Sequence, residues 1–246
     1  MAELERLELE HAGKHLVGEI ARPSGAGPHP AVLVMASALG LGPQPRHAAR
    51  ALAAEGYLAV ATDMYGEGAF FADPSKAGED YMAVMSSPDL LRSRVLAWFA
   101  RVAALPGVDS RRVAAIGYCF GGACVLDLAR SGAEVRAVVS YHGILTTRTP
   151  ARPGAIKGVV AAWCGGKDPY APPETITALG EELTAAGARH QITTFAEAAH
   201  GFTDRWHSFT APGIAYDAIA DKVSWAGTLA LLAEVFRALL AEVFSA

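Results

Sequence analysis

Short runs of apolar residues recur along the chain, and several are unbroken, which is typical of parallel strands that are covered on both faces. Six such runs predict strands, at residues 31–35, 58–62, 113–117, 137–141, 158–163 and 191–195. Residues 4–10 and 15–20 instead alternate partly between polar and apolar, with Ala12-Gly13-Lys14 between them. This pair of segments predicts an antiparallel hairpin at the edge of the sheet.

Stretches with helical character separate most of these runs, and several end at glycine or proline. They lie at residues 46–55, 90–104, 121–130 and 173–186, with a long last helix ending near Phe244. Strands that alternate with helices predict an α/β fold with a mostly parallel, doubly wound sheet, whose ligand sites lie at the carboxyl ends of the strands. We expect a single domain over residues 1–246, because α/β folds of this length often form one.

Two segments, residues 64–88 and 201–213, lack clear periodicity and contain many aromatic residues. We interpret them as walls of a pocket; the alternative is that they are surface loops with buried anchors.

Composition narrows the function classes. Of the 246 residues, 52% are hydrophobic and 19% charged, and the net charge of -4 argues against a nucleic-acid partner. The acidic N-terminus carries no secretory signal pattern, and no run approaches the ~18 apolar residues of a membrane helix. The three cysteines are odd in number and do not match a zinc spacing. We therefore expect a cytoplasmic protein without a membrane or nucleic-acid partner.

One segment, Gly117-Tyr118-Cys119-Phe120-Gly121, has the form of a nucleophile elbow between a strand and a helix. Glycines on both sides of the central residue allow a sharp turn that exposes its side chain. A thiol at a helix N-terminus is favoured as the thiolate by the N–H groups and the helix dipole. The alternative is that Cys119 is a buried structural cysteine beside a tight turn.

Two residues further along complete the order nucleophile, acid, histidine that this type of fold uses. Asp168 directly follows the apolar run at 158–163 and a short Gly-Gly-Lys segment, and His200 follows the run at 191–195. Each has a simpler explanation alone: Asp168 as a turn or capping residue before Pro169, and His200 as a hydrogen-bonded loop histidine. Their shared order and placement favour a triad with Cys119.

With these motifs, the sequence resembles the dienelactone hydrolase family of α/β-hydrolases over nearly its whole length. The matching segments are 31–34, 40–42, 63–66, 117–122, 165–169 and 199–202. The resemblance implies a metal-free and cofactor-free hydrolase of esters or lactones. It implies a catalytic triad of Cys119, Asp168 and His200, and an oxyanion hole formed by the backbone N–H groups of Ala38 and Phe120.

The sequence departs from the family pattern in the loop after the first parallel strand, where Ser37 stands at the position of a family glutamate. The arginine expected after the catalytic histidine is also shifted or lost, since Asp204 and Arg205 stand there. The shifted arginine argues against an acidic dienelactone as substrate. The substitution at Ser37 is the feature that supports an alternative function, a non-catalytic or altered-substrate binding protein on a hydrolase scaffold. A thiol redox role ranks third, because a helix turns Cys124 away from Cys119.

Further expectations concern ligands and assembly. No phosphate loop, dinucleotide fingerprint or H-E-x-x-H metal motif is present, and we expect no metal. The partner is expected to be a small ester or lactone, and the chain a monomer or weak homodimer. The candidate residues of the substrate pocket are Ser37, Leu39, Tyr65, Phe70, Tyr81 and Trp206.

Overall fold

The computed structural model describes residues 2–207 and 211–244, and its centre is a mixed sheet of eight strands in the order β1-β2-β4-β3-β5-β6-β7-β8. Strands β3 to β8 run parallel, whereas β1 and β2 form an antiparallel hairpin that joins the sheet through β4. The predicted edge hairpin and mostly parallel α/β sheet are confirmed. The strands are β1 Leu4–His11, β2 Lys14–Ala21, β3 His29–Met35, β4 Leu58–Thr62, β5 Val108–Tyr118, β6 Ala137–Tyr141, β7 Val159–Gly165 and β8 His190–Phe195.

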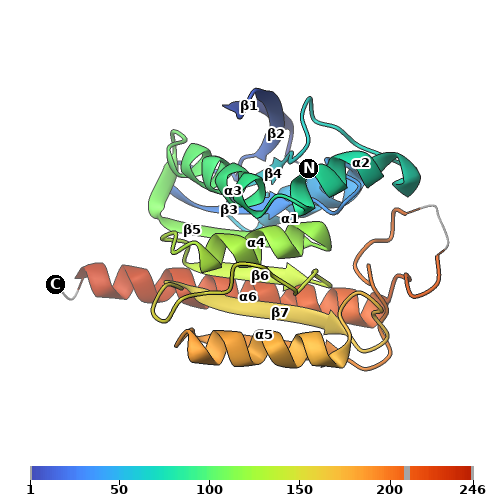
Figure 1. Cartoon of the computed structure of the whole chain (residues 1–246). Coiled ribbons are helices and arrows are strands. Elements are labelled where there is room, and N and C mark those ends of the chain that lie inside the picture. Colours follow the sequence, from blue (N-terminus) through green and yellow to red (C-terminus); the bar gives the residue numbers. More distant parts are fainter. Residues whose placement is uncertain (1, 208–210, 245–246) are drawn as a thin grey trace.

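Helices cover both faces of the sheet (Figure 1). Helices α3, α4 and α5 lie in front of the sheet in this view and α6 passes behind it. Within the described residues, no helix is both long and apolar enough to cross a lipid bilayer. The helices are α1 Pro43–Ala54, α2 Pro74–Met85, α3 Pro88–Ala103, α4 Phe120–Arg130, α5 Pro173–Ala185 and α6 Ala218–Phe244.

The sheet separates two hydrophobic cores, because alternate residues of a strand face opposite sides. In β3, Ala31, Leu33 and Met35 belong to the core beneath α3, α4 and α5. Val32 and Val34 belong to the core beneath α1 and α6. Both faces of the central strands are therefore dry, which explains their unbroken apolar runs.

Residues 64–88, interpreted from sequence as a pocket wall without clear periodicity, contain helix α2 at Pro74–Met85, and Pro74 and Tyr81 of this helix line a cavity. The Asp73 carboxylate caps this helix by accepting a hydrogen bond from the Ser75 N–H, and Pro74 begins it. Only Ala77 and Val84 of α2 are buried. Helix α3 follows α2 without a strand between them, so the alternation of strands and helices gives no signal for α2.

Helix α1 begins at Pro43, three residues before the predicted start at 46. Proline is compatible with the first helical turn, because the N–H group it lacks would have no partner within the helix. The Pro-Gln-Pro segment therefore begins the helix instead of preceding it.

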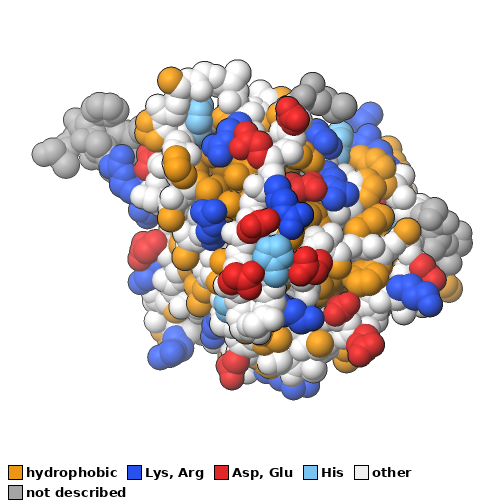
Figure 2. All heavy atoms as spheres, turned by 90° about the horizontal axis from the view of Figure 1, so that it is seen from above, with side chains coloured by type: hydrophobic (Ala, Val, Ile, Leu, Met, Phe, Trp, Pro, Cys, Tyr) orange, Lys and Arg blue, Asp and Glu red, His pale blue; other side chains and the backbone are white. Residues whose placement is uncertain are grey.

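The edge of the sheet at β1 is protected by charge. Arg6 pairs with Glu8, and Arg22 of the neighbouring chain segment pairs with Glu5. Figure 2, which looks down on this side of the molecule, shows side chains of both charges interspersed among hydrophobic patches. Charged side chains along an edge strand disfavour pairing with the edge of another sheet.

Candidate active site

The loops after four parallel strands meet at the carboxyl edge of the sheet. Ser37 and Ala38 follow β3, Cys119 follows β5, Asp168 follows β7 and His200 follows β8. Side chains separated by up to 163 residues in the sequence are thus assembled at one place by the parallel topology.

Cys119 stands at a sharp turn between β5 and α4, with φ 53° and ψ -111°, a conformation that is uncommon for a residue with a side chain. The turn leaves no room for side chains at its glycines. A Cβ atom at Gly117 would lie 2.0 Å from the Gly121 carbonyl oxygen, and one at Gly121 would lie 2.2 Å from the Met35 oxygen. The glycines therefore bring the elbow against the end of β3, and the strained residue is the cysteine.

The Cys119 sulfur interacts with His200 and with the backbone N–H groups of Ala38 and Phe120. Desolvation in the site raises the pKa of the thiol, but the charge of His200 and these hydrogen bonds outweigh it, so the pKa lies below its ordinary value. The site thus favours a thiolate beside an imidazolium.

Asp168 and His200 are both buried, and His200 Nδ1 lies 2.8 Å from Asp168 Oδ2. Burial lowers the pKa of His200, but the charge of Cys119 and the hydrogen bond to Asp168 raise it to about 10. Asp168 Oδ1 also accepts a hydrogen bond of 2.8 Å from the Tyr170 N–H. The carboxylate therefore both stabilises its own turn and hydrogen-bonds the imidazole. A turn residue and a partner of His200, the two interpretations of Asp168 from sequence, are thus compatible.

Tyr65 lies behind the two backbone donors instead of lining the cavity. Its hydroxyl donates to the Ala38 carbonyl oxygen over 3.1 Å, and its ring stacks on Phe120 with centroids 5.8 Å apart. The loop that presents Tyr65 is organised by Asp63, whose buried carboxylate accepts hydrogen bonds from four backbone N–H groups, including that of Tyr65 itself.

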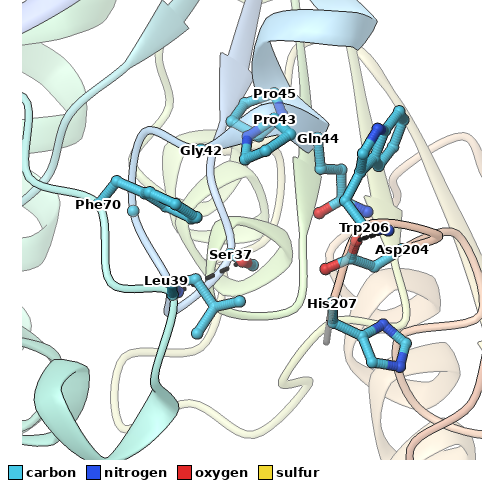
Figure 3. Close-up of a pocket in the computed structure, with 12 residues that line it drawn as sticks. Ser37, Leu39, Gly42, Pro43, Gln44, Pro45, Phe70, Asp204, Trp206 and His207 are labelled. Carbon is cyan, nitrogen blue, oxygen red and sulfur yellow. Dashed lines mark hydrogen bonds between the residues drawn. The ribbon is translucent and has the colours of Figure 1, made fainter. Parts of the chain in front are cut away.

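A cavity of about 230 Å³ opens above Cys119, and Ser37, Leu39 and Tyr81 line it together with His200. A smaller pocket of about 50 Å³ adjoins it and shares Ser37 and Leu39. In Figure 3, Ser37 lies between Phe70 and Leu39 on one side and Gln44, Trp206 and Asp204 on the other. Of the six pocket candidates, three thus line the larger cavity. Phe70 and Trp206 line the smaller one, and Trp206 also lines a third pocket beside Arg205.

Several lining residues were not identified from sequence, and His142 is the most notable. It is buried after β6 with a positive φ of 37°, and its ring lies edge-on to His200 with centroids 5.2 Å apart. Its Nε2 is 2.8 Å from Thr203 Oγ1, which accepts a hydrogen bond from the Gln44 amide. Burial and the charge of His200 hold the pKa of His142 well below its ordinary value, so it is neutral. The feature of the sequence that could have indicated His142 was its position directly after an apolar strand.

Tyr170 was also not identified from sequence as a residue of the site. Its ring stands edge-on to His200 at 4.7 Å although half of the residue is exposed. Its proximity to Asp168 in the sequence was the signal that could have indicated it.

The remaining cysteines lie in the core. Cys124, on α4, and Cys164, on β7, are both buried, and burial raises the pKa of each thiol above its ordinary value. Neither has the electropositive, accessible surroundings of a reactive thiol.

Arg205 does not reach the cavity above Cys119. Its guanidinium lies over the Trp206 ring at 4.9 Å and 3.7 Å from an Asp221 carboxylate oxygen, beside a separate pocket. As for metals, no group of three or more His, Cys, Asp or Glu side chains in the described part of the chain is arranged to hold an ion.

Comparison with known proteins identifies the family of this chain. A model of the dienelactone hydrolase family matches residues 16–236. The chain is 29% identical over 204 residues to an Escherichia coli K12 protein named "putative carboxymethylenebutenolidase", covering 77% of this chain and 74% of that protein. It is 34% identical over 157 residues to an uncharacterised Caenorhabditis elegans protein, covering 59% of this chain and 94% of that one.

Among solved structures, a dienelactone hydrolase-like promiscuous phosphotriesterase from metagenomic libraries is 33% identical and superposes with a TM-score of 0.89, covering 96% of this chain and 99% of that one. The family match includes every segment that builds the site. The chain belongs to the dienelactone hydrolase family of the α/β-hydrolase superfamily and is a dienelactone hydrolase-like hydrolase.

Proposed function

We propose that the protein hydrolyses carboxylic esters or lactones through a triad of Cys119, His200 and Asp168 and a covalent thioester. The observation that carries the proposal is the set of groups around one sulfur atom. His200 and two backbone N–H groups converge on Cys119, and Asp168 holds the far side of the imidazole. This set supplies a nucleophile, a base with an orienting carboxylate, and anion-stabilising donors.

In the first half-reaction, the thiolate of Cys119 attacks the ester carbonyl carbon, and the carbonyl oxygen becomes an oxyanion. The N–H groups of Ala38 and Phe120 stabilise this oxyanion, and a donor of this kind contributes about 2.7–4 kcal/mol to the transition state. When the intermediate collapses, the carbon–oxygen bond breaks and the departing alkoxide takes a proton from His200. In a lactone, the alcohol produced remains attached to the acyl group.

In the second half-reaction, water cleaves the thioester. Acylation removes the charge of the Cys119 thiolate, which is the largest cause that raises the pKa of His200. The pKa of His200 in the acyl-enzyme is therefore lower, and the neutral imidazole accepts a proton from water. The oxygen bonds to the acyl carbon, the carbon–sulfur bond breaks, and the acid leaves as the thiolate and imidazolium re-form.

Ser37 is the feature that favours the alternative, a binding protein without turnover. It lines the cavity at the position where the family resemblance implies a glutamate. The groups that lower the pKa of the Cys119 thiol, namely His200 and the two backbone donors, do not include Ser37. The proposed chemistry therefore does not depend on a carboxylate at this position.

Hydrolysis of 4-nitrophenyl esters and unsaturated lactones by the wild type and Cys119→Ala tests the proposal. We expect turnover by the wild type, none by Cys119→Ala, and a thioester on Cys119 detectable by mass spectrometry after rapid acid quenching. Cys164→Ala is the matched control, because it removes a buried cysteine elsewhere, and it should retain activity.

Equal rates in the wild type and Cys119→Ala, with unchanged circular dichroism, would exclude the triad. Absence of both turnover and acylation in the wild type would favour the binding protein.

A second candidate activity is hydrolysis of neutral phosphotriesters, supported by the 33% identity to a protein described as a promiscuous phosphotriesterase. The thiolate would attack phosphorus and expel an aryloxide, and the two N–H groups would bind the phosphoryl oxygen. Water, deprotonated by His200, would then attack phosphorus, break the phosphorus–sulfur bond and release the phosphodiester and the thiolate. Release of 4-nitrophenol from diethyl 4-nitrophenyl phosphate by the wild type, but not by Cys119→Ala, is the expected result.

A further inference from the structure

The cavity above Cys119 has mainly apolar walls. They come from five different segments of the chain, including α2 and the loops after β3, β6 and β7. The apolar and aromatic members are Leu39, Pro74, Tyr81, Ile144, Tyr170 and Ile214. Such walls favour burial of hydrocarbon over water.

No lysine or arginine is among the described residues that line this cavity. The nearest arginine in the sequence to the catalytic loop, Arg205, is paired with Asp221 beside a different pocket. His142, which does line the cavity, is neutral. The His200 imidazolium is already engaged by Asp168 and Cys119. A third histidine, His207, lines the cavity together with the carboxylate of Asp204.

Two oxygen-bearing groups in the walls oppose an anion. Asp204 contributes a carboxylate to the lining. The Gln44 amide nitrogen donates to Thr203, while its buried Oε1 has no hydrogen-bond partner among the described residues. The Asp204 carboxylate and the Gln44 carbonyl oxygen both repel a carboxylate. A substrate that carried an anionic group into the cavity would lose its hydration without gaining a counter-ion, which is costly.

The volume of the cavity limits what it accepts. An apolar protein cavity of about 150 Å³ holds one benzene molecule. The cavity above Cys119 measures about 230 Å³, so it can accept an aromatic ring with a few further atoms or a chain of similar size.

We propose that the enzyme is selective for neutral esters and lactones with an apolar acyl group the size of a six- to eight-carbon chain or an aromatic ring, and that it discriminates against substrates with a carboxylate on that group. The proposal rests on the proposed hydrolytic function and specifies its substrate class. An acidic lactone is therefore not the expected substrate, because no lysine or arginine among the described lining residues would pair with its carboxylate.

The test compares two esters that differ only at the end of the acyl chain: 4-nitrophenyl hexanoate and the mono-4-nitrophenyl ester of adipic acid, in which a carboxylate replaces the terminal methyl group. At pH 7.5 we expect kcat/KM for the hexanoate to exceed that for the adipate by at least about 100-fold, as for a polar group left unpaired in a buried site.

A variant with a positive charge in the wall should weaken the preference. Ile144 is partly buried at the cavity wall, and its N–H donates to the Cys119 carbonyl oxygen over 3.3 Å, a backbone contact that substitution preserves. Ile144→Arg should raise the adipate-to-hexanoate ratio of kcat/KM at least about 10-fold, because it supplies a charged donor. Ile144→Gln, a polar but uncharged control, should leave the ratio within about 3-fold of the wild type.

Ile214→Arg places the charge on another lining segment and serves as the second variant if Ile144→Arg does not fold. Comparable kcat/KM for the two esters in the wild type, or an unchanged ratio in a folded arginine variant, would overturn the proposed selectivity while leaving hydrolysis by Cys119 intact. Absence of turnover and acylation with both esters in the wild type would instead overturn the hydrolytic function, and the selectivity with it.

Discussion

The Tyr65 hydroxyl donates a hydrogen bond of 3.1 Å to the carbonyl oxygen of Ala38, whose N–H group points at the Cys119 sulfur. The same tyrosine ring stacks on Phe120, the source of the second N–H group. One buried side chain thus supports both backbone donors of the proposed oxyanion hole from behind.

Tyr65→Phe should therefore lower kcat with little change in KM. Loss of one hydrogen bond costs about 0.5–1.5 kcal/mol, which corresponds to a decrease of roughly 2- to 10-fold. Steady-state kinetics with a 4-nitrophenyl ester measures the effect. Tyr57→Phe, at a buried tyrosine that packs on Phe236 instead, is the control and should be neutral. A change confined to KM would instead place Tyr65 in substrate binding.

Asp168→Asn should reduce kcat by about 10³- to 10⁴-fold, because an amide at this position favours the imidazole tautomer that presents an N–H group to the sulfur. KM should change little, since Asp168 is fully buried behind His200. Asp109→Asn is the matched control, because Asp109 lies at the start of β5 and Cys119 follows the other end of that strand. An effect on KM alone would contradict the role of Asp168 in orienting His200.

Ser37→Glu should slow alkylation of Cys119 by iodoacetamide near pH 6. A carboxylate near the sulfur disfavours the thiolate and raises the pKa of the thiol, whereas the wild-type surroundings lower it. The measurement uses a background with Cys124→Ala and Cys164→Ala, so that Cys119 is the one thiol that reacts. Ser37→Gln controls for size without charge. Equal alkylation profiles in all variants, or a wild-type thiol pKa at or above the ordinary ~8.5, would contradict a thiolate that forms before substrate binds.

Arg130→Met should destabilise the fold by about 3–5 kcal/mol, because it leaves the Glu182 carboxylate without its partner in a largely buried site. The two side chains are 2% and 13% exposed and 2.8 Å apart. Arg237→Met, in the exposed pair with Glu234, is the control and should have no measurable effect. Urea unfolding gives both values.

The Arg130–Glu182 pair also predicts a pH dependence. Burial raises the pKa of Glu182, but hydrogen bonds from Arg130 and the Ala151 N–H outweigh burial and lower it below its ordinary value of 4.5. The stabilisation is therefore complete above pH 4.5 and is lost as the pH falls through the lowered value. The wild type and Arg130→Met should differ less in stability in strong acid than at pH 7.

Gly121→Ala should prevent folding or destabilise it by more than about 3 kcal/mol, since the new Cβ would lie 2.2 Å from the Met35 carbonyl oxygen. Gly78→Ala, within α2, is the contrasting substitution because no atom lies within 4 Å of the point that a Cβ would occupy there. Alanine at this position should stabilise by about 0.5–1 kcal/mol. Denaturant midpoints measure both, and a tolerated Gly121→Ala would show that the elbow has room to shift.

The sheet could be predicted from sequence because its strands are buried on both faces and therefore carry unbroken apolar runs, as in β3 and β4. Helix α5, which buries two side chains, was indicated by its place between two apolar strands. Helix α2 also buries two, but it shares its crossover with α3 and no strand separates the two helices, so the alternation of strands and helices gave no signal for it.

Convergence of Cys119, Asp168 and His200 was predictable because each follows a parallel strand, and parallel strands end at one edge. The position of Tyr65 was not predictable. Its sequence context indicates an aromatic residue in a loop, but not whether the side chain lines the cavity or packs behind Ala38 and Phe120. His142 was missed because a histidine after a strand has no motif of its own; its orientation depends on Thr203, sixty-one residues away.

The contact of Gly121 with the carbonyl oxygens of Met35 and Ala36 joins the loop that carries the sulfur to the loop that carries the Ala38 donor, backbone against backbone. That separation is set by backbone contact and supported from behind by Tyr65, and the side chains that line the cavity take no part in it. Substitutions at Leu39, Ile144 or Ile214 can consequently alter which acyl group is accepted without displacing the reacting atoms. The fold thereby permits divergence in substrate range at a constant reaction geometry, and libraries directed at these three positions should yield altered specificity with few inactive members.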